Sequence, residues 1–113
     1  MYPSGSWRGY WDQPAFGRQP MNDLVLRFAG GVVEGEGRDF VGRFTFDGSY
    51  DDRGNVVMVK QYLGKHRVLY RDGYDGEGTL FGTWSIGDRF SGPFALSAVR
   101  PTAAPDAPIR DIS

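Results

Sequence analysis

Turn-forming residues interrupt this chain at short, regular intervals, and that spacing limits its fold more than any other feature. Between the turns, apolar and polar residues alternate, as is typical of half-buried β-strands. Seventeen glycines and many aromatic residues disfavour helices, because glycine destabilises a helix and aromatic side chains favour pleated surfaces. We predict eight strands, at Ser6–Asp12, Asp23–Ala29, Val32–Gly37, Phe40–Tyr50, Asn55–Leu63, His66–Gly73, Thr79–Ile86 and Phe90–Val99.

The connections between these strands are mostly short, which predicts that each strand pairs with the next in an antiparallel meander. Only one connection is long, Gln13–Asn22, and it contains two prolines. Eight strands can curl into a small closed barrel that leaves no exposed edge. We therefore predict an all-β, eight-stranded antiparallel up-and-down β-barrel over residues 1–100, followed by a flexible Pro/Ala-rich tail over residues 101–113.

Alternation also assigns the inward faces of the strands. In Phe40–Tyr50, every second residue from Phe40 onward is aromatic or glycine, so this set is predicted to face the core. Inward glycines fit a barrel that bends sharply and must leave room for large rings. So many inward aromatic rings argue against a large cavity, because an eight-stranded barrel is narrow. The other predicted inward residues are Leu24, Leu26, Phe28, Leu80, Gly82, Trp84, Ile86, Phe94, Leu96 and Ala98.

The stretch V-K-Q-Y-L-G-K-H-R-V-L-Y, residues 59–70, is compatible with two hairpin registers. A two-residue turn at Gly64-Lys65 would place Lys60 and His66 on opposite faces, and a glycine in the first loop position suits that turn. A three-residue loop, 63–65, would instead align Lys60 and His66 on one face with Tyr62 and Tyr70. One residue in the loop therefore decides which side chains share the interior.

The motif G-x-W at Gly5-Ser6-Trp7 resembles the start of calycin-like barrels, the lipocalins and avidin-like proteins, which are eight-stranded meanders. In lipocalin-like barrels the resemblance implies that a basic side chain from the end of the last strand packs on this tryptophan. Arg100 occupies the matching place, and a sheltered cation over an indole contributes ~1 kcal/mol. The alternative is that Trp7 is an ordinary core residue and that Arg100 is solvated.

The segment from Phe28 to Phe94 also resembles short bacterial and fungal β domains of unknown function. The shared pattern includes K-x-Y at Lys60 and Tyr62 and G-x-H-x-V-x-Y from Gly64 to Tyr70. Its recurring residues are every other one through the hairpin, which favours the three-residue loop. We adopt that register, and the resemblance implies no activity.

In this register Lys60 faces inward, where a phenol, a carboxylate or a ligand anion must compensate its charge. An aromatic pocket with a few polar groups is the usual form of a small-molecule site. Phe16, on the long connection, is predicted to act as a lid over a mouth edged by Arg38, Asp39, His66 and Arg89. The alternative is that Lys60 reaches the surface and His66 caps a hairpin. The predicted ligand-binding residues are Lys60, Tyr62, His66, Tyr70, Trp84, Phe44 and Phe16.

Composition excludes several classes of partner and chemistry. The formal net charge is −1, with basic and acidic residues interspersed, so we expect neither a nucleic-acid nor a membrane partner. Without cysteine there is no thiolate chemistry, and without a signal peptide or apolar span we expect a cytoplasmic protein. With one histidine and no catalytic motif, we expect no catalytic residue, no metal and no cofactor.

Three functions follow from these residues. The first is a module that binds a small molecule inside the barrel. The second is a filled barrel that acts through protein contacts or homo-oligomer assembly, with Tyr10 and Phe81 as candidate contact residues. The third, and the least supported, is an enzyme that uses Lys60 and His66 in acid–base chemistry.

Overall fold

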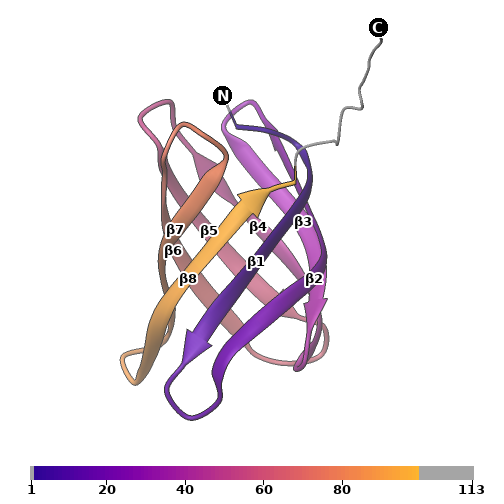
Figure 1. Cartoon of the computed structure of the whole chain (residues 1–113), viewed down its shortest axis with the longest axis vertical. Helices are drawn as coiled ribbons and strands as arrows, with labels where there is room; N and C mark the ends of the chain where they lie inside the picture. Colours follow the sequence, from indigo (N-terminus) through magenta and orange to yellow (C-terminus); the bar gives the residue numbers. More distant parts are fainter. Residues whose placement is uncertain (1, 100–113) are drawn as a thin grey trace, which may run out of the picture.

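A computed structural model describes residues 2–99, which form a closed barrel of eight antiparallel strands (Figure 1). Each strand pairs with the next, and β8 pairs with β1, so the predicted fold class is confirmed. The predicted tail, residues 101–113, lies outside the described residues. Within residues 2–99, no helix could cross a membrane. The strands are β1 (Gly5–Gln13), β2 (Gly17–Ala29), β3 (Val32–Asp39), β4 (Gly42–Tyr50), β5 (Asn55–Tyr62), β6 (Arg67–Tyr74), β7 (Thr79–Ile86) and β8 (Phe90–Ala98).

The predicted long connection at Gln13–Asn22 is wrong, because most of it belongs to β2. Gln13 pairs with Gly17, so β1 and β2 form a tight hairpin. Pro20 pairs with β1, whereas the register of β2 with β3 begins only at Asn22. This part of β2 therefore resembles an edge strand, where a residue without an N–H is tolerated.

The inward faces follow the predicted alternation except at Phe40 and at His66, which was expected to face inward with Lys60 but is exposed at the end of the barrel. Phe40 is exposed, because β3 continues to Asp39 and pairs there with Gly42. Phe40 and Val41 form the turn between β3 and β4, so the prediction of an inward Phe40 is wrong. The buried apolar core comprises Trp7, Trp11, Met21, Leu24, Leu26, Val33, Phe44, Phe46, Val56, Met58, Tyr62, Val68, Tyr70, Leu80, Trp84, Phe94 and Leu96.

The hairpin between β5 and β6 has the three-residue loop that we adopted. Lys60 pairs with Val68, and Met58 pairs with Tyr70. The amide of Tyr62 donates to the carbonyl oxygen of His66 at 3.2 Å, which closes the loop. Gly64 has a φ of 70°, a left-handed conformation that glycine adopts readily. Lys60 and Tyr62 therefore face the interior together.

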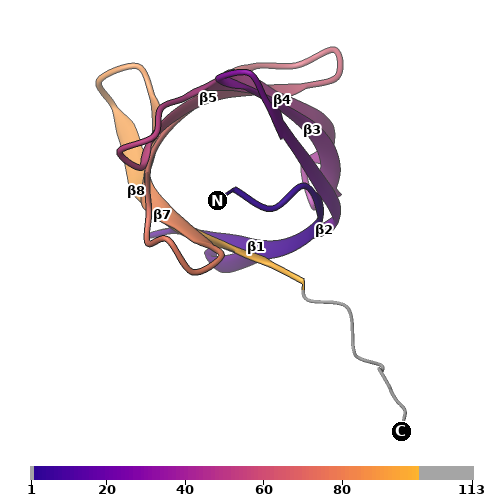
Figure 2. The same cartoon turned by 90° about the horizontal axis from the view of Figure 1, so that it is seen from above.

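One end of the barrel is covered by aromatic side chains from the N-terminal segment. Seen from above, the described N-terminal segment runs from near the middle of the barrel opening to β1 (Figure 2). The Tyr2 ring lies 5.0 Å from that of Phe28 and 4.5 Å from those of Tyr50 and Tyr74. Trp7 is buried beneath this cluster, and its predicted partner Arg100 lies outside the described residues. We call this the closed end.

Inward glycines allow neighbouring strands to approach each other closely. A Cβ at Gly48 would overlap the carbonyl oxygen of Val57 on β5, and a Cβ at Gly82 would overlap that of Arg71 on β6. These overlaps involve backbone atoms, which cannot move aside as a flexible side chain can. The small circumference of the barrel therefore depends on glycine at these positions.

Near the closed end, β6 carries an inward acid, Asp72. Both carboxylate oxygens of Asp72 are buried and accept no hydrogen bond from the described residues. Burial raises the pKa of Asp72 to about 8. At pH 7 the side chain is therefore mainly protonated, which avoids an uncompensated charge in the interior.

Substitution of Gly48 by alanine should destabilise the barrel by ~2 kcal/mol or more, because the methyl group overlaps backbone. Gly73→Ala is the matched control, since a Cβ there has open space around it. Urea unfolding of both variants measures the difference. Equal unfolding free energies for the two variants would contradict the role of Gly48.

Asp72→Asn should change how stability depends on pH. Between a pKa near 4 in the unfolded chain and about 8 in the fold, folded Asp72 keeps a proton that the unfolded chain releases. The unfolding free energy of the wild type should therefore fall, relative to that of Asp72→Asn, by up to ~1.4 kcal/mol per pH unit.

The measurement is denaturant unfolding of both proteins from pH 5 to pH 9, with the exposed Asp47→Asn as control. The difference between wild type and Asp72→Asn should stop growing above about pH 8. A difference that does not vary with pH would mean that Asp72 ionises normally in the fold.

Candidate functional site

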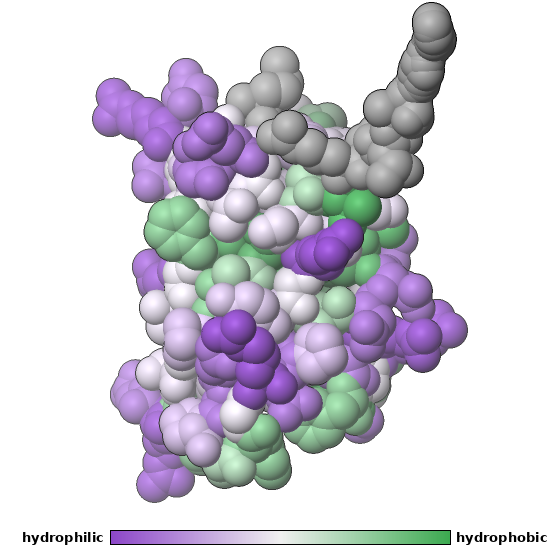
Figure 3. Space-filling model, in the orientation of Figure 1, coloured by the Kyte–Doolittle hydropathy of each residue, from purple (hydrophilic) through white to green (hydrophobic). Residues whose placement is uncertain are grey.

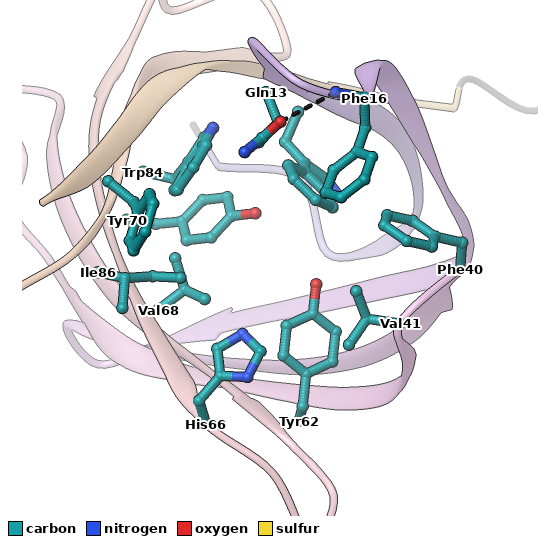
Figure 4. Close-up of a pocket in the computed structure, with 12 residues that line it drawn as sticks. Gln13, Phe16, Phe40, Val41, Tyr62, His66, Val68, Tyr70, Trp84 and Ile86 are labelled. Carbon is teal, nitrogen blue, oxygen red and sulfur yellow. Dashed lines mark hydrogen bonds between the residues drawn. The ribbon is translucent and has the colours of Figure 1, made fainter.

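The four hairpins β1–β2, β3–β4, β5–β6 and β7–β8 meet at the end opposite Tyr2, which we call the open end. A cavity of about 180 Å³ lies there, and most of its lining is apolar (Figure 4). The volume is small for an eight-stranded barrel, as the number of inward rings predicts. The lining residues are Trp11, Gln13, Phe16, Phe40, Val41, Tyr62, His66, Val68, Tyr70, Trp84, Ile86 and Phe90.

A buried ion pair lies beneath this cavity. The ammonium of Lys60, on β5, is 2.7 Å from Oδ2 of Asp39 at the end of β3, and neither side chain has exposed surface. Strand alternation places both inward: Lys60 follows Met58, and Asp39 follows Val33, Gly35 and Gly37 along one face. Asp39 is therefore the carboxylate that compensates Lys60.

Asp39 has three further hydrogen-bond donors. The hydroxyl of Tyr62 donates to Oδ2 at 2.7 Å, and Nε1 of Trp11 donates to the same oxygen at 3.1 Å. The backbone amide of Val41, in the β3–β4 turn, donates to Oδ1 at 3.0 Å. With Lys60 included, the carboxylate thus accepts four hydrogen bonds and joins three strands and a turn.

Lys60 has fewer hydrogen-bond partners than Asp39. Beyond Asp39, its ammonium reaches the hydroxyl oxygen of Tyr70 at 3.3 Å and the sulfur of Met21 at 3.7 Å. The ammonium also lies 4.2 Å from the ring centre of Phe44, within the range of a cation–π contact. Burial lowers the pKa of Lys60 to about 8 despite the opposing effect of Asp39, so the side chain is mainly charged at pH 7.

The contact between Lys60 and Tyr70 fixes the direction of one proton. An ammonium can only donate, so the Tyr70 oxygen accepts from Lys60 and its own proton must point elsewhere. Among residues 2–99, no acceptor for that proton is present. Burial raises the pKa of Tyr70, so the proton stays on the hydroxyl. The hydroxyls of Tyr62 and Tyr70 point toward the middle of the ring of lining residues (Figure 4).

Other polar groups lie closer to solvent, around the cavity entrance. Oε1 of Gln13 accepts from the amide of Phe16 at 2.9 Å, and within the described chain its NH2 group donates to no residue. The ring of His66 lies 5.1 Å from that of Tyr62. Nε1 of Trp84 is already used, because it donates to the carbonyl oxygen of Asp12 at 2.8 Å. Among the described residues of the entrance, the NH2 group of Gln13 and the ring nitrogens of His66 are therefore the polar groups without a hydrogen-bond partner.

The structure brings together most of the predicted site residues. Five of them line the cavity: Phe16, Tyr62, His66, Tyr70 and Trp84. Lys60 and Phe44 lie below that lining, and the predicted basic partner of Trp7, Arg100, lies outside the described residues. Phe16 occupies the tip of a hairpin, with its ring edge-on to Phe40 at 5.7 Å. Whether any of these residues contacts a ligand stays a prediction.

Sequence reasoning missed three residues of the buried cluster: Trp11, Met21 and Asp39. Asp39 was expected at the rim, because the Arg38-Asp39 pair resembled a turn. Continuing the alternation past Gly37 would have placed its carboxylate inside. Met21 fell in the presumed long connection, which hid its inward position. The structure also shows that Arg38, expected at the mouth, binds Asp23 at 2.6 Å.

Comparisons with known proteins identify no relative. No protein-family model matches the chain, and a search of curated proteins found no match. In the part of the chain that the structure describes, no three metal-binding side chains of His, Cys, Asp or Glu gather in one place. The function must therefore be argued from the open end of the barrel.

Replacing Asp39 should destabilise the protein more than replacing Lys60, the other member of the ion pair. Asp39→Asn should cost ~3–5 kcal/mol, because it leaves a buried ammonium without a carboxylate. Lys60→Met should cost less, ~1–3 kcal/mol, because Asp39 keeps the donors from Tyr62, Trp11 and Val41.

Urea unfolding of the two variants at pH 7 tests this asymmetry, and Arg27→Met in the exposed pair with Glu36 should leave stability near that of wild type. A greater loss for Lys60→Met than for Asp39→Asn would show that Lys60, and not Asp39, is the better compensated member.

Proposed function

We propose that this protein binds a small, neutral, mainly apolar molecule in the cavity at the open end. The single observation that carries the proposal is the hydroxyl proton of Tyr70, which lies at a cavity wall and has no acceptor among the described residues. A buried donor without a partner costs ~1–3 kcal/mol, so a ligand that supplies an acceptor recovers that energy.

The ion pair beneath the cavity argues for a neutral ligand. From the sequence alone, an inward Lys60 gives a reason to expect a bound anion. Asp39 already neutralises Lys60 at 2.7 Å, so an anion in the cavity would lie beside a carboxylate, and no lysine or arginine is among the residues that line the cavity. The role of Lys60 is then indirect: by donating to Tyr70, it turns the Tyr70 proton toward the ligand.

Cavity size limits the ligand to about one or two rings. A cavity of about 150 Å³ with apolar walls accommodates benzene in another protein, so a space of about 180 Å³ suits a substituted benzene. The lining residues Trp11, Phe16 and Trp84 would contact the ring faces and edges. The free NH2 of Gln13 and the ring of His66 would meet the outer end of the molecule.

The architecture supports a calycin-like interpretation, which belongs to the same proposal. The G-x-W tryptophan, Trp7, is buried at the closed end, where the last strand returns beside the first. A barrel closed at one end, with an apolar cavity at the other, has the form of a lipocalin-like binding protein.

Three probes of similar size test the proposal: acetophenone, ethylbenzene and benzoate. Acetophenone offers a neutral acceptor, ethylbenzene none, and benzoate an anionic one. Acetophenone should bind about five- to tenfold more tightly than ethylbenzene, the equivalent of one hydrogen bond, and benzoate should bind most weakly. Titration calorimetry and saturation-transfer NMR measure the three affinities.

Tyr70→Phe should remove the preference for acetophenone and preserve the affinity for ethylbenzene. Tyr50→Phe is the matched control, because Tyr50 lies at the closed end beside Tyr2. The proposal fails if no probe binds at millimolar concentration, or if acetophenone keeps its advantage in Tyr70→Phe.

A further inference from the structure

Each of the four hairpins at the open end carries one large apolar side chain in an exposed position. Phe16 of β1–β2 is 62% exposed, Phe40 of β3–β4 is 59%, Leu63 of β5–β6 is 58% and Phe90 of β7–β8 is 54%. Phe16 and Phe40 are in contact, and three of the four side chains also line the cavity entrance. We call these four residues the apolar rim.

The rim concentrates exposed apolar surface at one end of the molecule. Exposed apolar side chains that occur singly need no explanation, but a contiguous group marks a contact surface. On the face shown in Figure 3, hydrophobic and strongly hydrophilic side chains lie next to each other at the lower end, where the hairpin tips are. Apolar and charged side chains are therefore neighbours at the hairpin tips on this face.

The charged residues beside the rim are mainly basic. Arg18 and Arg38 form salt bridges with Asp12 and Asp23. Four other basic residues have no carboxylate partner among the described residues. Of the described acidic side chains in the same hairpin tips, Asp88 alone is both exposed and unpaired. The four unpaired basic residues are Arg43, Lys65, Arg67 and Arg89.

The closed end has the opposite charge. Among the described residues, its loops carry Asp51, Asp52, Asp75 and Glu77 against one cation, Arg53. Hydrogen bonds from Asn55 lower the pKa of Asp51, and hydrogen bonds from the backbone amides of Glu77 and Thr79 lower that of Asp75, so both stay ionised at neutral pH. The barrel is therefore basic at its open end and acidic at its closed end, although its net charge is close to zero.

We propose that the open end docks on an anionic lipid surface, with the apolar rim inserted among the headgroups and the basic residues against lipid phosphates. Apolar side chains surrounded by cations are the combination that binds peripheral proteins to anionic bilayers. The acidic closed end is repelled by the same surface, which orients the barrel with its cavity facing the lipid.

A second copy of the chain fits this surface less well. In a symmetric dimer each open end would face its own copy, so unpaired arginines would meet arginines across the contact. That repulsion opposes the burial of the rim. An anionic lipid surface offers the complementary charge, so we favour a lipid surface over a second copy of the chain.

Vesicle co-sedimentation tests the proposal, with phosphatidylcholine vesicles compared with vesicles that contain 30% phosphatidylglycerol. Wild-type protein should bind the anionic vesicles at least tenfold more tightly at 50 mM salt, and the difference should shrink at 500 mM. The charge-reversal variant Arg67→Glu/Arg89→Glu should lose most of this binding, since each basic residue contributes about fivefold near an anionic surface. Arg53→Glu at the closed end is its matched control.

Leu63→Ser/Phe90→Ser should weaken binding by about tenfold or more, because it removes two side chains of the rim. Phe81→Ser is the matched control, since Phe81 is similarly exposed but lies on the barrel wall. Circular dichroism of each variant confirms that the barrel is intact, and the charge reversals keep the test decisive if the rim variant fails to fold.

Three results would overturn the proposal. The first is equal binding, or no binding, to the two kinds of vesicle. The second is binding that the closed-end and wall controls reduce as much as the open-end variants do. The third is a doubled mass in light scattering that Leu63→Ser/Phe90→Ser abolishes while vesicles bind no protein, which would assign the rim to self-association.

Discussion

The ammonium of Lys60 and the carboxylate of Asp39 have no access to water, so the groups around them must supply the hydrogen bonds that water would otherwise make. Six strands contribute to this cluster, from Trp11 on β1 and Met21 on β2 to Tyr70 on β6. A buried ion pair is often no more stabilising than well-packed apolar residues, so its value here is geometric. It holds Tyr62 and Tyr70 with their hydroxyls at the cavity floor and thereby gives an otherwise apolar space a defined polarity.

Much of this arrangement could be predicted from the sequence, because alternation and glycine placement are local signals. The hairpin at Gly64 is different: its glycine alone favours a two-residue turn, and the pattern shared with other β domains selected the three-residue loop that the structure contains. The errors have local causes too. Two prolines made the start of β2 resemble a loop. The polar pair Arg38-Asp39 resembled a turn, so the predicted β3 ended too early, and the prediction placed Phe40 inside the barrel and Asp39 outside it.

The distribution of charge could not be predicted in the same way. Composition gives a net charge of −1 and an even mixture along the chain, which offered no reason to expect a charged surface. In a meander, successive loops fall at alternate ends, so residues that are interspersed in sequence are sorted in space. Lys65 and Asp75 are ten positions apart, yet they lie at opposite ends of the barrel. The difference in charge between the two ends becomes visible only when each loop is assigned to one end of the barrel.

The Tyr2 cluster has a kinetic consequence. Because stacked rings cover one end, a molecule bound in the cavity as we propose would enter and leave between the four hairpin tips, the open end of the described barrel. The time that it stays inside is then governed by the same Phe16, Phe40 and Phe90 side chains that meet any surface placed against that end. A barrel open at both ends could exchange its contents with water at any moment. In this barrel, a molecule in the cavity would exchange only with the solvent or surface that the hairpin tips face.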